Sequence, residues 1–321
     1  MNLSKRNVLL TFTTLCLAAS VLMGYQYLGA ELFVQAETWL ADQESGALRW
    51  LSWLFHSPWT DMLVQYVFVL GVGHVFAWLI VCWLPKDDRK QTGLTGFDFL
   101  ICSVASLGVG YLFNILGTFL NLGISLVTGK SLSDMNPVME MMYDLSPSML
   151  IYSCLLGPIM EEWMFRGVLL KRARLFGDWT AVVFTAVMFG LMHGNISQFL
   201  YATAIGVILG YVAVKTNGIR YTVLIHILLN SYNTLTVMVE EWLYQIDPVL
   251  LPILYSALLL GVMGLLILGG VVIILKYGRH WYRQMKDRNG PQSLNRKYVY
   301  LNPGFLVYLA ICMVEFLHYL A

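Results

Sequence analysis

Charged residues are scarce in this sequence. They make up 12% of its 321 residues, whereas hydrophobic residues make up 58%. A soluble globular domain carries roughly 25% charged residues, so this chain has too little polar surface to coat a water-soluble body of its size. We therefore expect a membrane protein, because a bilayer suits such a composition.

Cysteine pairs and an excess of charge are also lacking. The five cysteines lie singly in apolar runs, without the CxxC spacing of a metal site, and we expect them to be buried free thiols. The net charge of +1 argues neither for nor against nucleic acid, and we expect no nucleic-acid partner.

Apolar stretches recur along the whole chain, and most have the ~20 residues that a membrane helix needs. The first follows Lys5 and Arg6 and is too long for a signal peptide, so we interpret it as an uncleaved membrane helix. The sequence predicts an all-α, polytopic membrane helix bundle with about eight or nine transmembrane helices. The predicted spans are 8–29, 62–84, 98–127, 147–170, 179–193, 196–214, 221–239, 249–275 and 300–319.

Basic and base-poor segments alternate between these spans. Lysines and arginines cluster before the first span and after the second, fourth, sixth and eighth, whereas acidic residues dominate the other loops. By the positive-inside rule, the N-terminus lies in the cytoplasm and, with nine spans, the C-terminus lies outside.

Ionisable residues within spans are costly and usually mark function. The fourth span carries Glu161, Glu162 and Arg166. Glu162 and Arg166 share a helix face, so an ion pair between them would neutralise this carboxylate. Glu161 points about 100° away and is left without a partner in its own helix, as a general base requires. Alternatively, both glutamates only hydrogen-bond neighbouring helices.

Two further spans carry polar residues at helical spacing. Phe189 lies one turn before His193, and His226 lies one turn before Asn230, although each histidine alone is more often a core residue. The donors of His226 and Asn230 could meet at one point, as a developing oxyanion needs. At 1.5 Å per residue, Glu161, His193, His226 and Asn230 lie about 15, 22, 9 and 15 Å from the cytoplasmic ends of their helices. They could therefore converge on one cavity that opens towards the cytoplasm.

In order and spacing, three motifs resemble the signatures of the CAAX protease and bacteriocin-processing (CPBP, or Abi) family. They are Glu161-Glu162-x-x-x-Arg166, Phe189-x-x-x-His193 and His226-x-x-x-Asn230, and the resemblance covers roughly residues 145–240. Gly167 fits the bacterial form of the first motif.

The resemblance implies an intramembrane endopeptidase. Glu161 would be the general base towards water, with His193 as its partner. His226 and Asn230 would stabilise the oxyanion, and Glu162, Arg166 and Phe189 would support the site. We expect a multi-pass protein of the cell membrane, of bacterial type. It divides into N-terminal membrane helices (1–145), a catalytic core (146–240) and C-terminal helices with a basic cytoplasmic loop (241–321).

The family was long described as metallopeptidases, and zinc is an alternative here. However, no HExxH motif occurs, and zinc bound by Glu161 and the histidines would leave only Glu162 as a base, beside Arg166. We therefore expect a metal-free mechanism without a cofactor.

Three functions remain open at this stage. The first is cleavage of a membrane-associated peptide or lipidated protein by glutamate-activated water. The second is a non-catalytic immunity or scaffold protein that keeps the same site. The third is a proton-coupled transporter that uses Glu161, His193 and His226 as a relay. The sequence does not identify the substrate or the oligomeric state.

Overall fold

The protein is described by a computed structural model for residues 5–42, 71–132, 143–286 and 297–320, with positions 59 and 135. Over these residues the secondary structure is helical, without strands, so the predicted all-α fold is confirmed. The helices are α1 (Lys5–Ala41), α4 (Gly73–Val81), α5 (Gly96–Thr128), α7 (Pro147–Ile151), α8 (Gly157–Glu162), α9 (Lys171–Ala173), α10 (Asp178–Leu191), α11 (Ile196–Thr216), α12 (Arg220–Ile246), α13 (Leu250–Met285), α14 (Lys297–Tyr300) and α15 (Pro303–Leu320).

The long helices account for most of the predicted spans. Within the described residues, α1, α5, α11, α12 and α13 are long and apolar enough to cross a membrane, and α10 and α15 are shorter apolar helices. The chain is therefore a multi-pass membrane protein. The predicted span 62–84 lies partly outside the described residues, and α4 is the part of it that is described as a helix.

Several helices are longer than the predicted spans, two of them by ten residues or more at one end. α1 continues to Ala41 rather than ending at 29, and α13 continues to Met285 rather than ending at 275. The added turns carry charged and polar residues such as Glu31 and Arg279. Hydropathy predicts where the apolar part of a helix ends, whereas backbone hydrogen bonding continues through polar residues that reach water.

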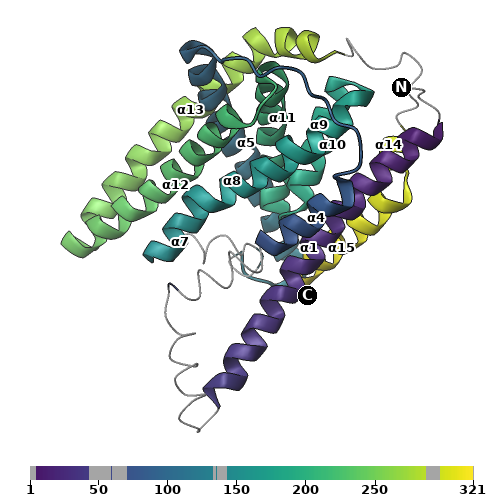
Figure 1. The fold of residues 1–321 in the computed structure, drawn as a ribbon. Coiled ribbons are helices and arrows are strands. Elements are labelled where there is room, and N and C mark those ends of the chain that lie inside the picture. Colours follow the sequence, from purple (N-terminus) through teal and green to yellow (C-terminus); the bar gives the residue numbers. More distant parts are fainter. Residues whose placement is uncertain are drawn as a thin grey trace.

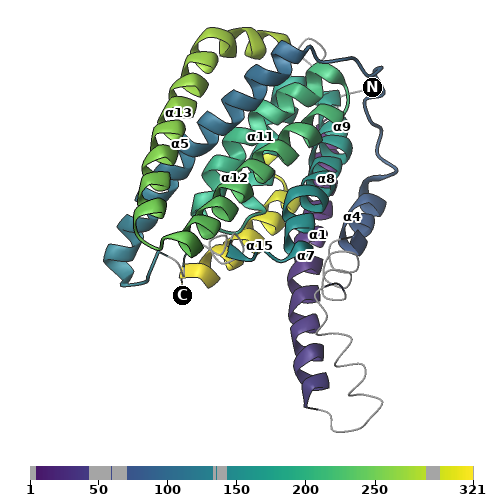
Figure 2. The ribbon, with the colours of Figure 1, turned by 90° about the vertical axis from the view of Figure 1, so that its left-hand side faces the viewer.

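The helices pack into one bundle (Figures 1 and 2). α11 packs against both α5 and α10, α13 packs along α5, and α1 packs against α4 and α15. Glycine allows close contact between α5 and α13, because a Cβ at Gly108 would lie 2.1 Å from the Leu266 carbonyl oxygen. Small residues at helix crossings are typical of membrane bundles, where close backbone approach supplies the packing energy.

The base-rich segments lie together at one end of the bundle, which we call the basic end. The chain between α4 and α5, residues 85–95, crosses this end. It is fixed by hydrogen bonds from the Asp87 amide to the Lys171 carbonyl and from the Thr92 amide to the Thr216 carbonyl, both 2.8 Å. The segment therefore joins helix ends that are far apart in the sequence.

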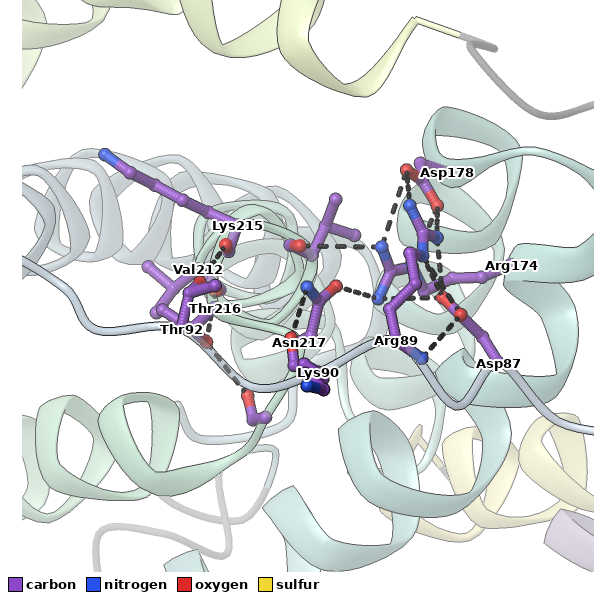
Figure 3. A network of polar contacts seen from close by, with 12 residues as sticks. Asp87, Arg89, Lys90, Thr92, Arg174, Asp178, Val212, Lys215, Thr216 and Asn217 are labelled. Atoms are coloured by element: carbon purple, nitrogen blue, oxygen red, sulfur yellow. Dashed lines mark hydrogen bonds and ion pairs between the residues drawn. The ribbon is translucent and has the colours of Figure 1, made fainter.

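An ion-pair network fastens this crossing segment (Figure 3). Arg174 lies 3.1 Å from Asp87 and 2.8 Å from Asp178, and Arg89 lies 3.0 Å from Asp178. Partial burial acts to raise the pKa of Asp87, but the hydrogen bond from Arg89 and the charge of Arg174 outweigh it and lower that pKa. Asn217 completes the network by donating to the Lys90 carbonyl and accepting from Arg174, both at 3.0 Å.

Candidate active site

The helix that carries the two glutamates is not a regular α-helix. Instead of one α-helix over 147–170, π-helical turns at Tyr152–Leu156 and Trp163–Leu170 flank α8. Pro158 is the second residue of α8 and lacks the amide hydrogen that a regular α-helix would use, which accounts for the changed hydrogen bonding before it. Such π-turns are frequent at functional sites, and here they bracket Glu161 and Glu162.

Glu162 and Arg166 form the predicted ion pair. Arg166 Nη1 lies 2.9 Å from Glu162 Oε1, and the two side chains are 1% and 0% exposed. The guanidinium also lies over the ring of Phe189, 4.3 Å from its centroid, and Nη2 is 3.5 Å from the Gly206 carbonyl oxygen. Arg166 therefore ties α8 to α10 and α11, and the prediction that Glu162 is a paired carboxylate is confirmed.

His226 lies against both glutamates. Its Nδ1 is 3.0 Å from Glu162 Oε1, and its Nε2 is 3.8 Å from Glu161 Oε2. A carboxylate only accepts hydrogen bonds, so we assign the hydrogen to Nδ1. In neutral His226 the Nε2 atom then carries a lone pair and cannot donate. In this tautomer His226 donates to Glu162 from Nδ1, and a donor at Nε2 requires the protonated ring.

His193 lies in the turn that follows α10. Its Nδ1 is 2.8 Å from the Phe189 carbonyl oxygen, so we assign the hydrogen to Nδ1 and the lone pair to Nε2. Among the described residues no hydrogen bond joins Glu161 and His193, although the two lie within electrostatic range. Gly194 follows with φ +66°, a left-handed conformation that lets the chain turn into α11.

Asn230 is only partly available as an oxyanion donor. Its Nδ2 donates at 2.8 Å to the Ser153 carbonyl oxygen in the π-helical turn before α8. One N–H of Asn230 thus already has a backbone acceptor, and the prediction that Asn230 and His226 aim donors at one point depends on the other N–H. The amide retains its second N–H, since an asparagine nitrogen carries two hydrogens.

Glu161 is the accessible carboxylate of the pair. Its side chain is 24% exposed, whereas that of Glu162 is fully buried. The structure thus brings together the residues that the three motifs predicted, with Glu161 open, Glu162 enclosed and His226 between them. It adds two backbone groups, the carbonyls of Ser153 and Gly206, which no side-chain pattern in the sequence could reveal.

The residues fit a zinc ion poorly. Within the described part of the chain, no three His, Cys, Asp or Glu side chains are arranged to hold a metal. Glu162 already faces Arg166 and His226, and the Nδ1 atom of His193 faces a carbonyl. We derive no step of the reaction through a metal.

Comparison with known proteins connects this site to a family. Residues 144–232 match the family described as type II CAAX prenyl endopeptidase Rce1-like. YdiL, a candidate membrane peptidase of Bacillus subtilis (strain 168), is 30% identical over 90 residues, which are 27% of this chain and 36% of YdiL. The chain thus matches about a third of that relative's length. No solved structure matches the chain. The matched segment 144–232 contains the three motifs, so the similarity to this family covers the residues of the site.

Proposed function

We propose that this protein is an intramembrane endopeptidase that uses Glu161 to activate water. The observation that supports this proposal best is the contrast between the two adjacent glutamates. Glu162 is enclosed by Arg166 and His226, whereas Glu161 is accessible and has no ion pair with lysine or arginine among the described residues. A general base must reach its water, and Glu161 is the carboxylate that can.

The reaction follows from the hydrogen-bonding roles of the side chains. Glu161 takes a proton from a water molecule while the water oxygen attacks the peptide carbonyl carbon. The lone pair on His193 Nε2 accepts the second hydrogen of this water and orients it. Glu161 then returns its proton to the leaving nitrogen as the C–N bond breaks.

The oxyanion is stabilised by His226 and Asn230. The protonated imidazole of His226 donates from Nδ1 to Glu162 and from Nε2 to the oxyanion, and Asn230 supplies its remaining N–H. Glu162 fixes the orientation of the ring, as a buried aspartate does in serine proteases. Loss of one oxyanion donor typically lowers kcat by about 10²–10³.

The substrate is a membrane-associated peptide or a lipidated protein. A soluble polypeptide would have to desolvate many backbone groups to reach a site among apolar helices. The matched family's prenyl-endopeptidase description suggests lipidated chains as one class of substrate.

Purified protein in proteoliposomes tests the proposal. Wild type, Glu161→Gln and Glu31→Gln are assayed on a library of lipidated and unmodified peptides, with and without chelator. We expect cleavage by wild type and Glu31→Gln and its loss in Glu161→Gln. Equal cleavage by Glu161→Gln would refute the role of Glu161, and loss with chelator that zinc restores would refute the metal-free mechanism.

Two other functions give different results in the same vesicles. A non-catalytic binding protein retains peptide but releases no product. A proton-coupled transporter dissipates a pH gradient reported by an internal dye. The described residues favour the peptidase over the transporter, because the apolar side chains of Phe165, Leu169 and Ile225, on the basic-end side of the site, are fully buried.

A further inference from the structure

A cavity at the basic end of the bundle lies between the last turns of α11 and α13. Its volume is about 510 Å³, within the range of about 300–1,000 Å³ that is typical of small-molecule sites. Its lining residues lie outside the three motifs, so it is separate from the site around Glu161. The polar side chains that line it include Arg89, Tyr211, Lys215, His280, Arg283 and Gln284.

Polar and aromatic contacts hold the two walls of this cavity together. The Tyr211 hydroxyl on α11 donates to Gln284 Oε1 on α13 at 2.9 Å, and Gln284 Nε2 lies 2.9 Å from His280 Nε2. The ring of Tyr211 also stacks on Trp281 of α13, with the ring centroids 4.9 Å apart. A ligand that enters a cavity with fixed walls orders few side chains, so this geometry favours binding.

Positive side chains converge on the cavity from three segments that are far apart in the sequence. Arg89 comes from residues 85–95, Lys215 comes from α11, and Arg283 comes from α13. Figure 3 shows Arg89 and Lys215 on either side of Asn217. The positive-inside rule accounts for basic residues at this end of the bundle, but it does not require them to line one cavity. Their convergence therefore points to an anionic ligand.

The carboxylates beside the cavity already have cationic partners. Asp178, the only acidic side chain among the described residues that line it, lies 3.0 Å from Arg89, and Asp98 lies 2.8 Å from Lys215. Arg283 is exposed and forms no ion pair with a carboxylate of the described residues. The planar guanidinium of an arginine matches the geometry of phosphate oxygens, so Arg283 is suited to bind a phosphate group.

The cavity lies at the level where lipid headgroups meet the protein. The apolar part of α13 is exposed at Leu268, Val272 and Leu275, as expected of a face that contacts lipid. α13 also lies at the edge of the bundle, beside α5 (Figure 2). His280 and Arg283 follow about one to two turns after Leu275, next to the headgroups of the same leaflet. By the positive-inside rule this is the cytoplasmic leaflet, whose anionic lipids attract basic segments.

We infer that this cavity binds the phosphate group of an anionic lipid headgroup. The phosphate lies between Arg283 on α13 and Lys215 on α11, and the acyl chains lie along the exposed apolar face of α13. The bound lipid joins α13 to α11 and to residues 85–95, and thus stabilises the basic end. A soluble phosphate ester offers the same group to the same side chains, so the experiment separates the two sources. The inference does not depend on the proposed peptidase function.

Titration of the full chain, purified in detergent, tests the site. The melting temperature is measured as phosphatidylglycerol, phosphatidylcholine or glycerol 1-phosphate is added, and its rise with concentration gives an apparent dissociation constant. We expect phosphatidylglycerol to raise the melting temperature and zwitterionic phosphatidylcholine to raise it much less. A rise with phosphatidylglycerol alone supports a lipid as the ligand. A rise with glycerol 1-phosphate supports the phosphate site and identifies a soluble ester as a ligand.

Substitution of Arg283 locates the binding. Arg283→Gln should weaken the binding of phosphatidylglycerol about tenfold, because it removes a charge-assisted interaction with phosphate. Arg283→Lys keeps the charge and should bind more tightly than Arg283→Gln. Arg279→Gln is the matched control, because Arg279 is an exposed arginine one turn earlier on α13 that does not line the cavity. At physiological ionic strength, where exposed charges are largely screened, this variant should bind within about twofold of wild type.

Two results would overturn the inference. One is a melting temperature that responds to neither phosphatidylglycerol nor glycerol 1-phosphate. The other is binding that Arg283→Gln leaves unchanged, or that Arg279→Gln weakens as much as Arg283→Gln does, because the attraction would then be a general property of the basic surface. The titration requires no peptidase activity. Glu161→Gln should therefore bind phosphatidylglycerol as tightly as wild type, whether or not Glu161 acts on water.

Discussion

Glu162 Oε1 lies 3.0 Å from His226 Nδ1, and the same oxygen is 2.9 Å from Arg166. One buried carboxylate thus orients the imidazole and neutralises the guanidinium. Glu162 is too enclosed to act on water, but its charge fixes the tautomer of His226 and the position of Arg166. The two adjacent glutamates therefore have different roles, and substitutions at the two positions should differ in their effect on thermal stability.

Glu162→Gln should unfold the protein more readily as well as inactivate it. The substitution leaves Arg166 charged and fully buried without an ionic partner in its helix. Breaking a buried pair by removing one partner costs about 3–5 kcal/mol. Thermal unfolding in detergent measures this loss. Glu161→Gln should unfold close to wild type, because Glu161 is partly exposed and forms no ion pair with an arginine of the described residues.

A double substitution separates stability from activity. In Glu162→Leu/Arg166→Met no unpaired charge remains, and replacing a buried ion pair by apolar residues is often neutral or stabilising by about 1–4 kcal/mol. We expect the melting temperature to recover, whereas peptide cleavage stays absent because His226 has lost its orienting carboxylate. An active double variant would show that Glu162 has a purely structural role.

Local spacing predicted part of this site correctly. The Glu162–Arg166 pair follows from an i, i+4 spacing within one helix, which a sequence displays directly. The prediction that Glu161 and His226 lie together followed from their similar distances from the cytoplasmic ends of two separate helices. Both inferences depend on helix geometry alone, so they did not need the tertiary structure.

The orientation of the histidines could not be predicted in this way. It depends on acceptors from other elements, namely the carboxylate of Glu162 for His226 and a backbone carbonyl for His193. The bond from Asn230 to the Ser153 carbonyl depends on a π-turn that hydropathy does not detect.

Phe189→Leu should weaken both packing and activity. The ring stacks under Arg166 at 4.3 Å and meets His193 edge-on at 5.1 Å. A desolvated cation–π contact contributes about 2 kcal/mol, so the free energy of unfolding should fall by at least this amount. Because His193 loses its edge contact, kcat should fall as well, as measured by initial rates of peptide cleavage.

Phe184→Leu is the matched control. Phe184 lies on the same helix, is 0% exposed, and contacts Phe12 at 4.8 Å rather than a site residue. Its substitution should cost a comparable amount of stability and leave kcat unchanged. Equal losses of kcat in both variants would mean that Phe189 acts only through general packing.

Gly190→Ala should separate α10 from α11 beside His193. A Cβ at this position would lie 2.0 Å from Thr203 Oγ1 and 2.7 Å from the Phe199 carbonyl oxygen. The backbone oxygen cannot swing aside, so overpacking of about 1–3 kcal/mol is expected. Gly261→Ala on α13 meets no atom within 4 Å and should instead be neutral or stabilise by roughly 0.5–1 kcal/mol. Thermal unfolding of both variants measures whether Gly190→Ala lowers the melting temperature while Gly261→Ala keeps or raises it.

Because of the ion pairs of Asp87 at the basic end, the stability of the fold should depend on pH in the acidic range. The folded-state pKa of Asp87 is lowered because Arg89 and Arg174 outweigh its partial burial. Its ionised form therefore stabilises the fold fully above the unfolded-state pKa of about 4, and this contribution disappears as the pH falls through the lower folded-state pKa.

Asp87→Asn should accordingly be less stable than wild type at pH 7, and the difference should shrink below about pH 4. Asp88→Asn is the control, because the Asp88 side chain is 74% exposed and lies 3.6 Å from Lys86 at the surface. Such exposed pairs contribute about 0–1 kcal/mol, so this variant should follow wild type at every pH. A difference for Asp87→Asn that stays constant from pH 7 to pH 3 would mean that its charge does not hold residues 85–95 in place.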